Sequence, residues 1–128
     1  MKQLFVSVPM KGRTEEENKA SIQKMKKIAE IYEGEELELI DSYIEDNPPK
    51  DSKEAVWFLG ESLKKLAQAD VFMGICENYD WNGCCIEKEA AERYGIKAYA
   101  VPARYVIDNY NVLVQKLHPI CNDAMPTF

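Results

Sequence analysis

Short apolar runs alternate with longer amphipathic segments along the 128-residue chain. Four short, mostly apolar runs predict buried strands, at 3–8, 37–41, 70–76 and 97–102. Apolar residues recur at helical spacing in the segments between them, at 15–33, 52–68 and 83–95. Strands and helices that alternate through short connections predict an α/β fold. We expect a Rossmann-like (flavodoxin-like) three-layer sandwich with a parallel sheet of four to five strands.

Local signals define the first helix and the inner faces of the other two. Thr14, three residues before Glu17, predicts a capping box, and Gly34 ends that helix. In the second helix, helical spacing assigns the inner face to Val56, Leu59, Leu63 and Leu66. In the third, the same spacing forms an apolar seam from Ile86, Ala90, Ala91 and Tyr94. Glu87 lies at the edge of this seam, and we expect it in the first turn.

Composition restricts the class of protein. The length suits one domain over 1–128, with a core at 3–101 and a C-terminal extension at 102–128. A net charge of −6 argues against binding to a nucleic-acid polymer, and no apolar run approaches the ~20 residues of a membrane span. The first apolar run stops at a proline, which makes it a poor signal peptide. We therefore expect a cytoplasmic protein.

Four cysteines, Cys76, Cys84, Cys85 and Cys121, show no paired metal-binding spacing. In the cytoplasm they are expected to be reduced thiols. Two interpretations of Cys84 and Cys85 stay open: small buried side chains at the start of a helix, or a reactive thiol activated by the helix N-terminus. The only histidine, His118, lies far away in the sequence. We expect neither a metal nor a cofactor.

Glu87 is the main candidate for chemistry. Ligands of open parallel sheets bind at the carboxyl ends of the strands, and the third helix starts from a loop at that edge. A helix N-terminus favours negative charge, so we expect it to help keep Glu87 ionised. An ionised carboxylate in a cleft can attack or stabilise a developing cation. The alternative is structural, because glutamate is common in the first turn of a helix.

Three segments together carry a family resemblance: "FVSVPMKGR", "LAQADV" and "GCCIEKEAAERYG". In this order they resemble the nucleoside 2-deoxyribosyltransferase family and its nucleotide N-glycosidase relatives, most of all an uncharacterised branch of that group. The resemblance covers about residues 3–101. The family's glycine, catalytic glutamate, alanine and second glycine match Gly83, Glu87, Ala91 and Gly95.

The resemblance implies that Glu87 is a nucleophile. It would attack the anomeric carbon of a (deoxy)ribosyl group, so that the base departs and water or a second base completes the reaction. The departing base needs a proton, and the first candidate for that acid is Asp80, in the loop before Glu87. The second is Asp41, at the end of a strand. Asp70 starts its strand, at the wrong end of the sheet, and is expected to cap it.

One position departs from the family pattern. The family usually has an aspartate eight residues before the aspartate of "AD", and this chain has Ser62 there. A hydroxyl can bind a ribose or a base but supplies no charge. A changed substrate, simple hydrolysis, or binding of a nucleotide without turnover, as in a sensor or sequestering protein, all stay open.

The loop after the first strand contains Ser7, Pro9, Met10, Lys11, Gly12 and Arg13. In the N-glycosidase relatives the corresponding loop contacts a 5′-phosphate, a role in which Gly12 permits close approach and Arg13 donates two hydrogen bonds. The alternative is an exposed turn with two solvated cations. The loop does not match the Walker motif.

Aromatic residues give the last candidates. Tyr43, Tyr79 and Trp81 are placed to stack on a nucleobase, or else belong to loop packing or a subunit contact. Trp57 and Phe58 are expected to pack inside the domain or between subunits. Because family members generally assemble as dimers or higher, the resemblance implies a homodimer or higher homo-oligomer. The partner it implies is a small nucleoside or nucleotide.

Overall fold

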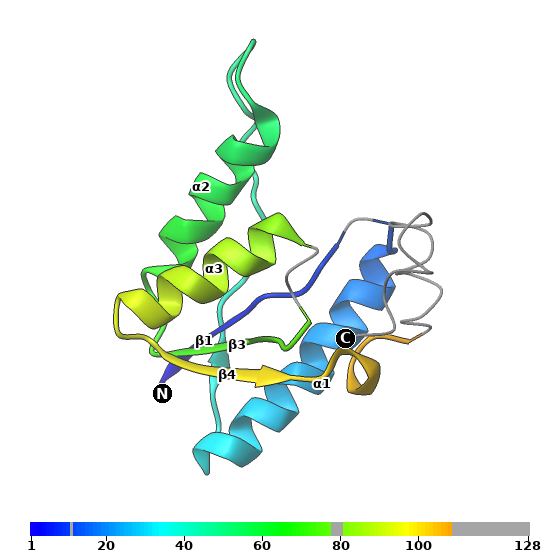
Figure 1. The fold of residues 1–128 in the computed structure, drawn as a ribbon, viewed down its shortest axis with the longest axis vertical. Helices are drawn as coiled ribbons and strands as arrows, with labels where there is room; N and C mark the ends of the chain where they lie inside the picture. Colours follow the sequence, from blue (N-terminus) through cyan, green and yellow to red (C-terminus); the bar gives the residue numbers. More distant parts are fainter. Residues whose placement is uncertain (11, 78–80, 109–128) are drawn as a thin grey trace.

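The computed structural model describes residues 1–10, 12–77 and 81–108, and its elements follow the predicted alternation (Figure 1). The strands are β1 (Gln3–Val6), β2 (Glu38–Leu39), β3 (Val71–Ile75) and β4 (Lys97–Val101). The helices are α1 (Glu15–Glu33), α2 (Glu54–Leu66), α3 (Asn82–Arg93) and a 3-10 turn, η2 (Ala103–Tyr105). The four predicted strands are confirmed, with β2 reduced to two residues. Most of the predicted C-terminal extension, residues 109–128, lies outside the described part of the chain.

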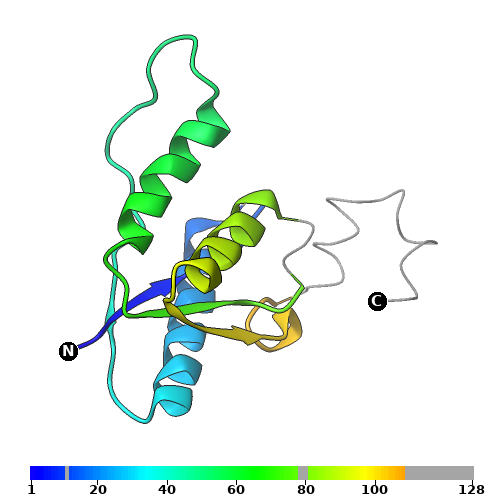
Figure 2. The same ribbon diagram turned by 60° about the vertical axis from the view of Figure 1, so that its left-hand side comes forward.

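The four strands form one parallel sheet in the order β2-β1-β3-β4. Helix α1 covers one face, and α2 and α3 lie on the other (Figures 1 and 2). Alternate residues of each strand therefore enter different cores. Leu4 and Met73 pack with α1, whereas Phe5 and Phe72 pack with α2 and α3. This confirms the predicted three-layer α/β architecture.

The ends of α1 match the sequence prediction. Thr14 accepts a hydrogen bond from the Glu17 backbone N–H, and the Glu17 carboxylate accepts one from the Thr14 N–H. Gly34 ends the helix with a φ of 77°, in the left-handed region that glycine adopts without a steric penalty. The capping box thus fixes where the chain enters α1 after β1, and Gly34 fixes where it leaves α1.

Two predicted inner faces were partly wrong. Val56 is exposed because the first turns of α2 project beyond the sheet (Figure 2). On α3, Ile86 and Tyr94 are 43% and 84% exposed, and the buried residues are Cys84, Glu87 and Ala91. Ala90 and Ala91 of the predicted seam pack in the core, and Ile86 and Tyr94 do not. The inward face also contains a carboxylate, Glu87.

Candidate functional site

The site lies where β1 ends and α3 begins. Ser7 follows β1 directly, and its backbone N–H donates to the carbonyl oxygen of Met73, which fixes Ser7 against β3. Glu87 extends from the buried face of α3 toward this point. Ser62 comes from α2, which packs on the same side of the sheet. Three separate elements therefore bring these three side chains together.

Both carboxylate oxygens of Glu87 accept hydrogen bonds from serine hydroxyls. The Ser7 Oγ donates to Glu87 Oε1 over 2.7 Å, and the Ser62 Oγ donates to Glu87 Oε2. Glu87 is only 9% exposed, and no described basic residue forms an ion pair with it. A buried carboxylate held by two neutral donors is costly to keep charged. Such buried titratable groups are more common at functional sites than in ordinary protein cores.

The pKa of Glu87 is raised above the ordinary glutamate value. Burial is the main cause, and the hydrogen bonds from Ser62 and Ser7 oppose it. We had expected the helix N-terminus to stabilise the charge. That expectation is not met, because α3 starts at Asn82 and Glu87 lies in its second turn, beyond the free N–H groups. Desolvation therefore controls the charge of this group.

This pKa shift predicts how stability depends on pH. The folded state holds the Glu87 proton to higher pH than the unfolded chain, so its contribution is complete below the ordinary value of 4.5 and is lost as pH rises through the raised pKa. Glutamine does not titrate. Glu87→Gln should therefore gain melting temperature relative to the wild type as pH increases from about 4.5 toward neutrality. Glu89→Gln, on the exposed side of α3, is the control. If the difference in melting temperature between the wild type and Glu87→Gln did not change with pH, the raised pKa of Glu87 would be contradicted.

Glu87 lines a cavity of about 550 Å³ at the carboxyl edge of the sheet. Its walls come from the segments after β1 and β2, from α2 and from the start of α3. Most lining side chains are apolar: Phe5, Val6, Val8, Pro9, Met10, Ile44, Ala55, Phe58, Leu59 and Trp81. The polar ones are Ser7, Ser42, Ser62, Asn82, Cys84 and Glu87. A concave, mostly apolar chamber with a few convergent polar groups is typical of a small-molecule site.

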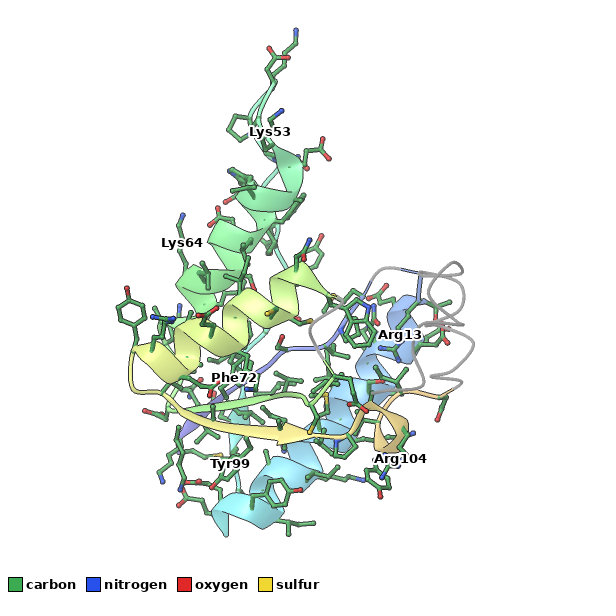
Figure 3. All side chains as sticks on the ribbon, in the orientation of Figure 1. Arg13, Lys53, Lys64, Phe72, Tyr99 and Arg104 are labelled. Atoms are coloured by element: carbon green, nitrogen blue, oxygen red, sulfur yellow. The ribbon has the colours of Figure 1, made fainter. Side chains whose placement is uncertain are left out.

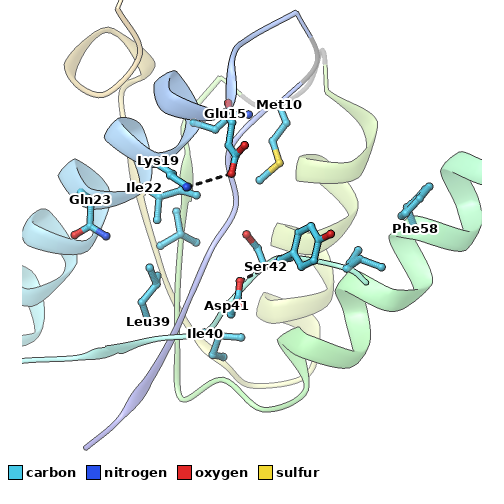
Figure 4. A pocket seen from close by; sticks show the side chains of 14 residues that line it. Met10, Glu15, Lys19, Ile22, Gln23, Leu39, Ile40, Asp41, Ser42 and Phe58 are labelled. Carbon is cyan, nitrogen blue, oxygen red and sulfur yellow. Dashed lines mark hydrogen bonds and ion pairs between the residues drawn. The ribbon is translucent and has the colours of Figure 1, made fainter. Parts of the chain in front are cut away.

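A second cavity of about 710 Å³ lies next to the first, between the start of α1 and the segment after β2 (Figure 4). Ile22, Leu39 and Ile40 contribute apolar surface. Its charged side chains are Glu15, Lys19 and Asp41, and Lys19 pairs with Glu15 at 3.1 Å. The two chambers together could hold a ligand larger than a single sugar ring.

The structure brings together most of the residues proposed from the sequence. Six of them line the Glu87 cavity with it: Ser7, Pro9, Met10, Ser62, Trp81 and Gly83. Asp41 and Tyr43 line the second cavity instead, where Asp41 Oδ1 accepts a hydrogen bond from the Tyr43 N–H. Lys11, Tyr79 and Asp80 lie outside the described residues. Asp70 accepts a hydrogen bond from the Gln3 N–H at the amino end of the sheet, as expected of a cap.

Arg13 does not point toward either cavity. Its guanidinium donates to the carbonyl oxygens of Pro9 and Glu17 and, over 2.6 Å, to the Ser21 hydroxyl (Figure 3). Gly12 does adopt a positive φ, 77°, but it is not among the described lining residues. The loop therefore turns its arginine onto α1. Its guanidinium is bonded within the protein in this conformation, and the phosphate contact of Arg13 stays a prediction.

The sequence argument missed several lining residues. Ser42 and Ile44 lie in the loop 42–52, which the sequence places at the ligand-binding edge without indicating these two residues. Phe58 and Leu59 line the cavity from α2, a helix whose residues the sequence assigns to packing. Cys84 also lines the cavity, and burial raises its thiol pKa to about 11, with a side-chain hydrogen bond between Cys84 and Ser7 opposing the shift. The thiol is thus neutral, which favours the packing interpretation.

Two further findings concern the described residues only. No group of three or more His, Cys, Asp and Glu side chains among them is arranged to hold a metal ion. None of the described helices has both the length and the apolar character needed to cross a membrane.

Comparisons with protein-family models, curated proteins and solved structures found no match to this chain.

Proposed function

We propose that this chain cleaves the N-glycosidic bond of a nucleoside or nucleotide, with or without transfer of the deoxyribosyl group, and that Glu87 is the nucleophile. The observation that supports this most directly is the position of Glu87. It is a buried carboxylate on the wall of a chamber at the carboxyl edge of a parallel sheet. The family resemblance of residues 3–101 supports the same reaction.

In the proposed reaction, an oxygen of Glu87 forms a bond to the anomeric carbon as the bond from that carbon to the base breaks. The electron pair of the broken bond leaves with the base. Water then hydrolyses the glycosyl ester and restores the carboxylate. The hydroxyls of Ser7 and Ser62 fix the orientation of both oxygens, which is the role of positioning residues. Asp80 stays the predicted acid, since the structure does not describe it.

Release of free base is the test of this function. The protein would be incubated with the four 2′-deoxynucleosides, the four ribonucleosides and their 5′-monophosphates, and the products separated by chromatography. We expect base and free sugar from at least one member of the panel. No release from any of them, at enzyme concentrations in the micromolar range, would contradict the proposed activity.

Ser62 supports a second candidate function, binding without turnover. Its hydroxyl occupies one oxygen of Glu87, at a position where the resembled family has a charged group. A nucleotide sensor or sequestering protein needs the chamber but not a free nucleophile. A ligand that raises the melting temperature and is recovered unchanged would favour this candidate over the enzyme.

Ser62→Ala separates a positioning role from a merely structural one. Its hydrogen bond lowers the pKa of Glu87, so its loss should raise that pKa further. If the carboxylate is the active form, the acid limb of the kcat/KM profile should move to higher pH. Ser42→Ala is the matched control, because Ser42 lines the same chamber and has no hydrogen bond to Glu87. Lower activity with an unmoved acid limb would contradict the positioning role.

We also propose that the chain is cytoplasmic and acts as a homodimer or higher homo-oligomer. The support for the oligomer is the projecting part of α2, where Val56 and Phe58 are exposed near one another and Trp57 packs edge-on against Phe58 at 5.0 Å between ring centroids. Contiguous exposed apolar groups mark interaction surfaces. Light scattering at micromolar concentration should give at least twice the mass of one chain, and a monomer would contradict this proposal.

A further inference from the structure

The two cavities share part of their walls, and together they are called the cleft below. Five residues line both of them: Val6, Met10, Ser42, Ile44 and Phe58. Glu87 lies in one chamber, and the charged groups of α1 and the segment after β2 lie in the other (Figure 4). If a sugar lies against Glu87, the base attached to it has room to extend along this shared wall.

The described lining of this cleft is acidic. It carries three acidic side chains, Glu15, Asp41 and Glu87, and one basic side chain, Lys19, which is paired with Glu15. Arg13, the nearest arginine in sequence, is held by hydrogen bonds to α1 and its own loop. An anionic group on the ligand would meet carboxylates that no free cation in the described lining offsets, whereas a positive charge would be attracted.

The leaving group fits the same preference. A neutral base that departs from the anomeric carbon becomes an anion unless an acid protonates it. Glu87 is the only Asp, Glu or His among the described residues of its chamber, and the predicted acid, Asp80, lies outside the described residues. A base that already carries a positive charge needs no proton, because it leaves as a neutral molecule.

We infer that the cleft takes nucleosides with a cationic base, such as an N-glycosylpyridinium or an N7-alkylated purine nucleoside, without a 5′-phosphate. This inference rests on the proposed function. Glu87 Oε forms a bond to the anomeric carbon, the carbon–nitrogen bond breaks, and its electron pair neutralises the ring nitrogen. The products of this step are a neutral base and a neutral glycosyl ester, and water supplies the oxygen and proton that release the sugar and restore Glu87.

The test compares matched pairs that differ in the charge of the base. 7-Methyl-2′-deoxyguanosine is compared with 2′-deoxyguanosine, and 7-methylguanosine with guanosine, each with and without a 5′-phosphate. Because cationic nucleosides hydrolyse faster on their own, each rate is divided by the rate without enzyme, and Glu87→Gln is run in parallel. We expect at least a tenfold larger acceleration for the cationic member of each pair, and a smaller one when the phosphate is present.

The possible outcomes separate the two proposals. Equal or greater acceleration of the neutral nucleosides, or a preference for the phosphorylated ones, would overturn the inference and leave the proposed glycosidase function standing. No acceleration of either member beyond that seen with Glu87→Gln would overturn both.

A charge variant tests the electrostatic argument directly. Glu15→Gln removes one acidic group and leaves Lys19 unpaired at the cleft, so KM for the cationic nucleoside should rise roughly three- to tenfold. Glu16→Gln is the matched control, since Glu16 is the next residue of α1, is exposed, and is not among the cleft-lining residues. An equal effect of the two variants, or no effect of Glu15→Gln, would overturn the inference that cleft charge selects the ligand.

Discussion

Replacing Glu87 with glutamine is expected to slow base release at least about a thousandfold, the largest effect of any substitution considered for this chain. Glutamine has the same shape, and its amide group can still bond to the Ser7 and Ser62 hydroxyls. It has no negative oxygen to attack the anomeric carbon. The fold should stay intact, because the substitution removes a buried charge that is costly to maintain.

The measurement is kcat for the best substrate of the panel, with circular dichroism and thermal melting to check the fold. Glu89→Gln, two residues further along α3 and exposed, should keep near wild-type activity. Ligand binding to Glu87→Gln should persist, which separates lost chemistry from lost binding. If the glutamine variant released base as fast as the wild type, Glu87 would have no part in the reaction.

Phe72→Ala is expected to cost about 3–5 kcal/mol of unfolding free energy, the largest effect on stability. Phe72 is fully buried between the sheet and the α2–α3 layer (Figure 3), with its ring stacked near that of Phe5 at 6.0 Å between centroids. A Cβ at Gly74 would lie 2.7 Å from the Phe72 ring, so the strand is already fitted tightly around it. Truncation would leave a cavity beneath the helices that carry Ser62 and Glu87.

Urea denaturation of both proteins gives this free energy. Phe58→Ala is the matched control, because Phe58 is 38% exposed at the rim of the cleft and should cost roughly 1 kcal/mol. If Phe72→Ala lost no more unfolding free energy than Phe58→Ala, the packing of Phe72 would not be what holds α2 and α3 to the sheet.

The strands and the caps could be predicted because their signals are local. Buried parallel strands appear as continuous apolar runs, and the Thr14–Glu17 box and Gly34 act within a few residues of themselves. The strand β2 was overestimated, since its outer edge pairs with no other described strand and the ladder with β1 covers only two residues.

The orientation of α3 could be predicted only in part from its apolar residues. Ala90 and Ala91 of the predicted seam pack in the core, whereas Ile86 and Tyr94 are exposed. The buried face is shifted toward Cys84 and Glu87, so that Glu87 lies within it and not at its edge. The error lies at the candidate functional residue, where a polar group is buried against the ordinary preference for apolar side chains.

The site was predicted in outline and not in its contacts. Placement at the carboxyl edge brought Ser7, Met10 and Trp81 to the same chamber as Glu87, as expected. The hydrogen bond from Ser62 to Glu87 joins residues 25 positions apart on two helices, and no local pattern indicates it. The orientation of Arg13 depends on the Ser21 hydroxyl and the carbonyl groups around it, and its position in the sequence does not indicate these contacts.

Trapping the covalent intermediate tests the central claim most directly. A nucleoside with fluorine at the 2′ carbon and a good leaving base slows the breakdown of a glycosyl ester, so that the ester accumulates and its mass can be measured on the intact protein and its peptides. The account predicts one added sugar on the peptide that contains Glu87, and none on the Glu87→Gln protein. Base release with an unmodified Glu87, or a sugar attached to another residue, would contradict it.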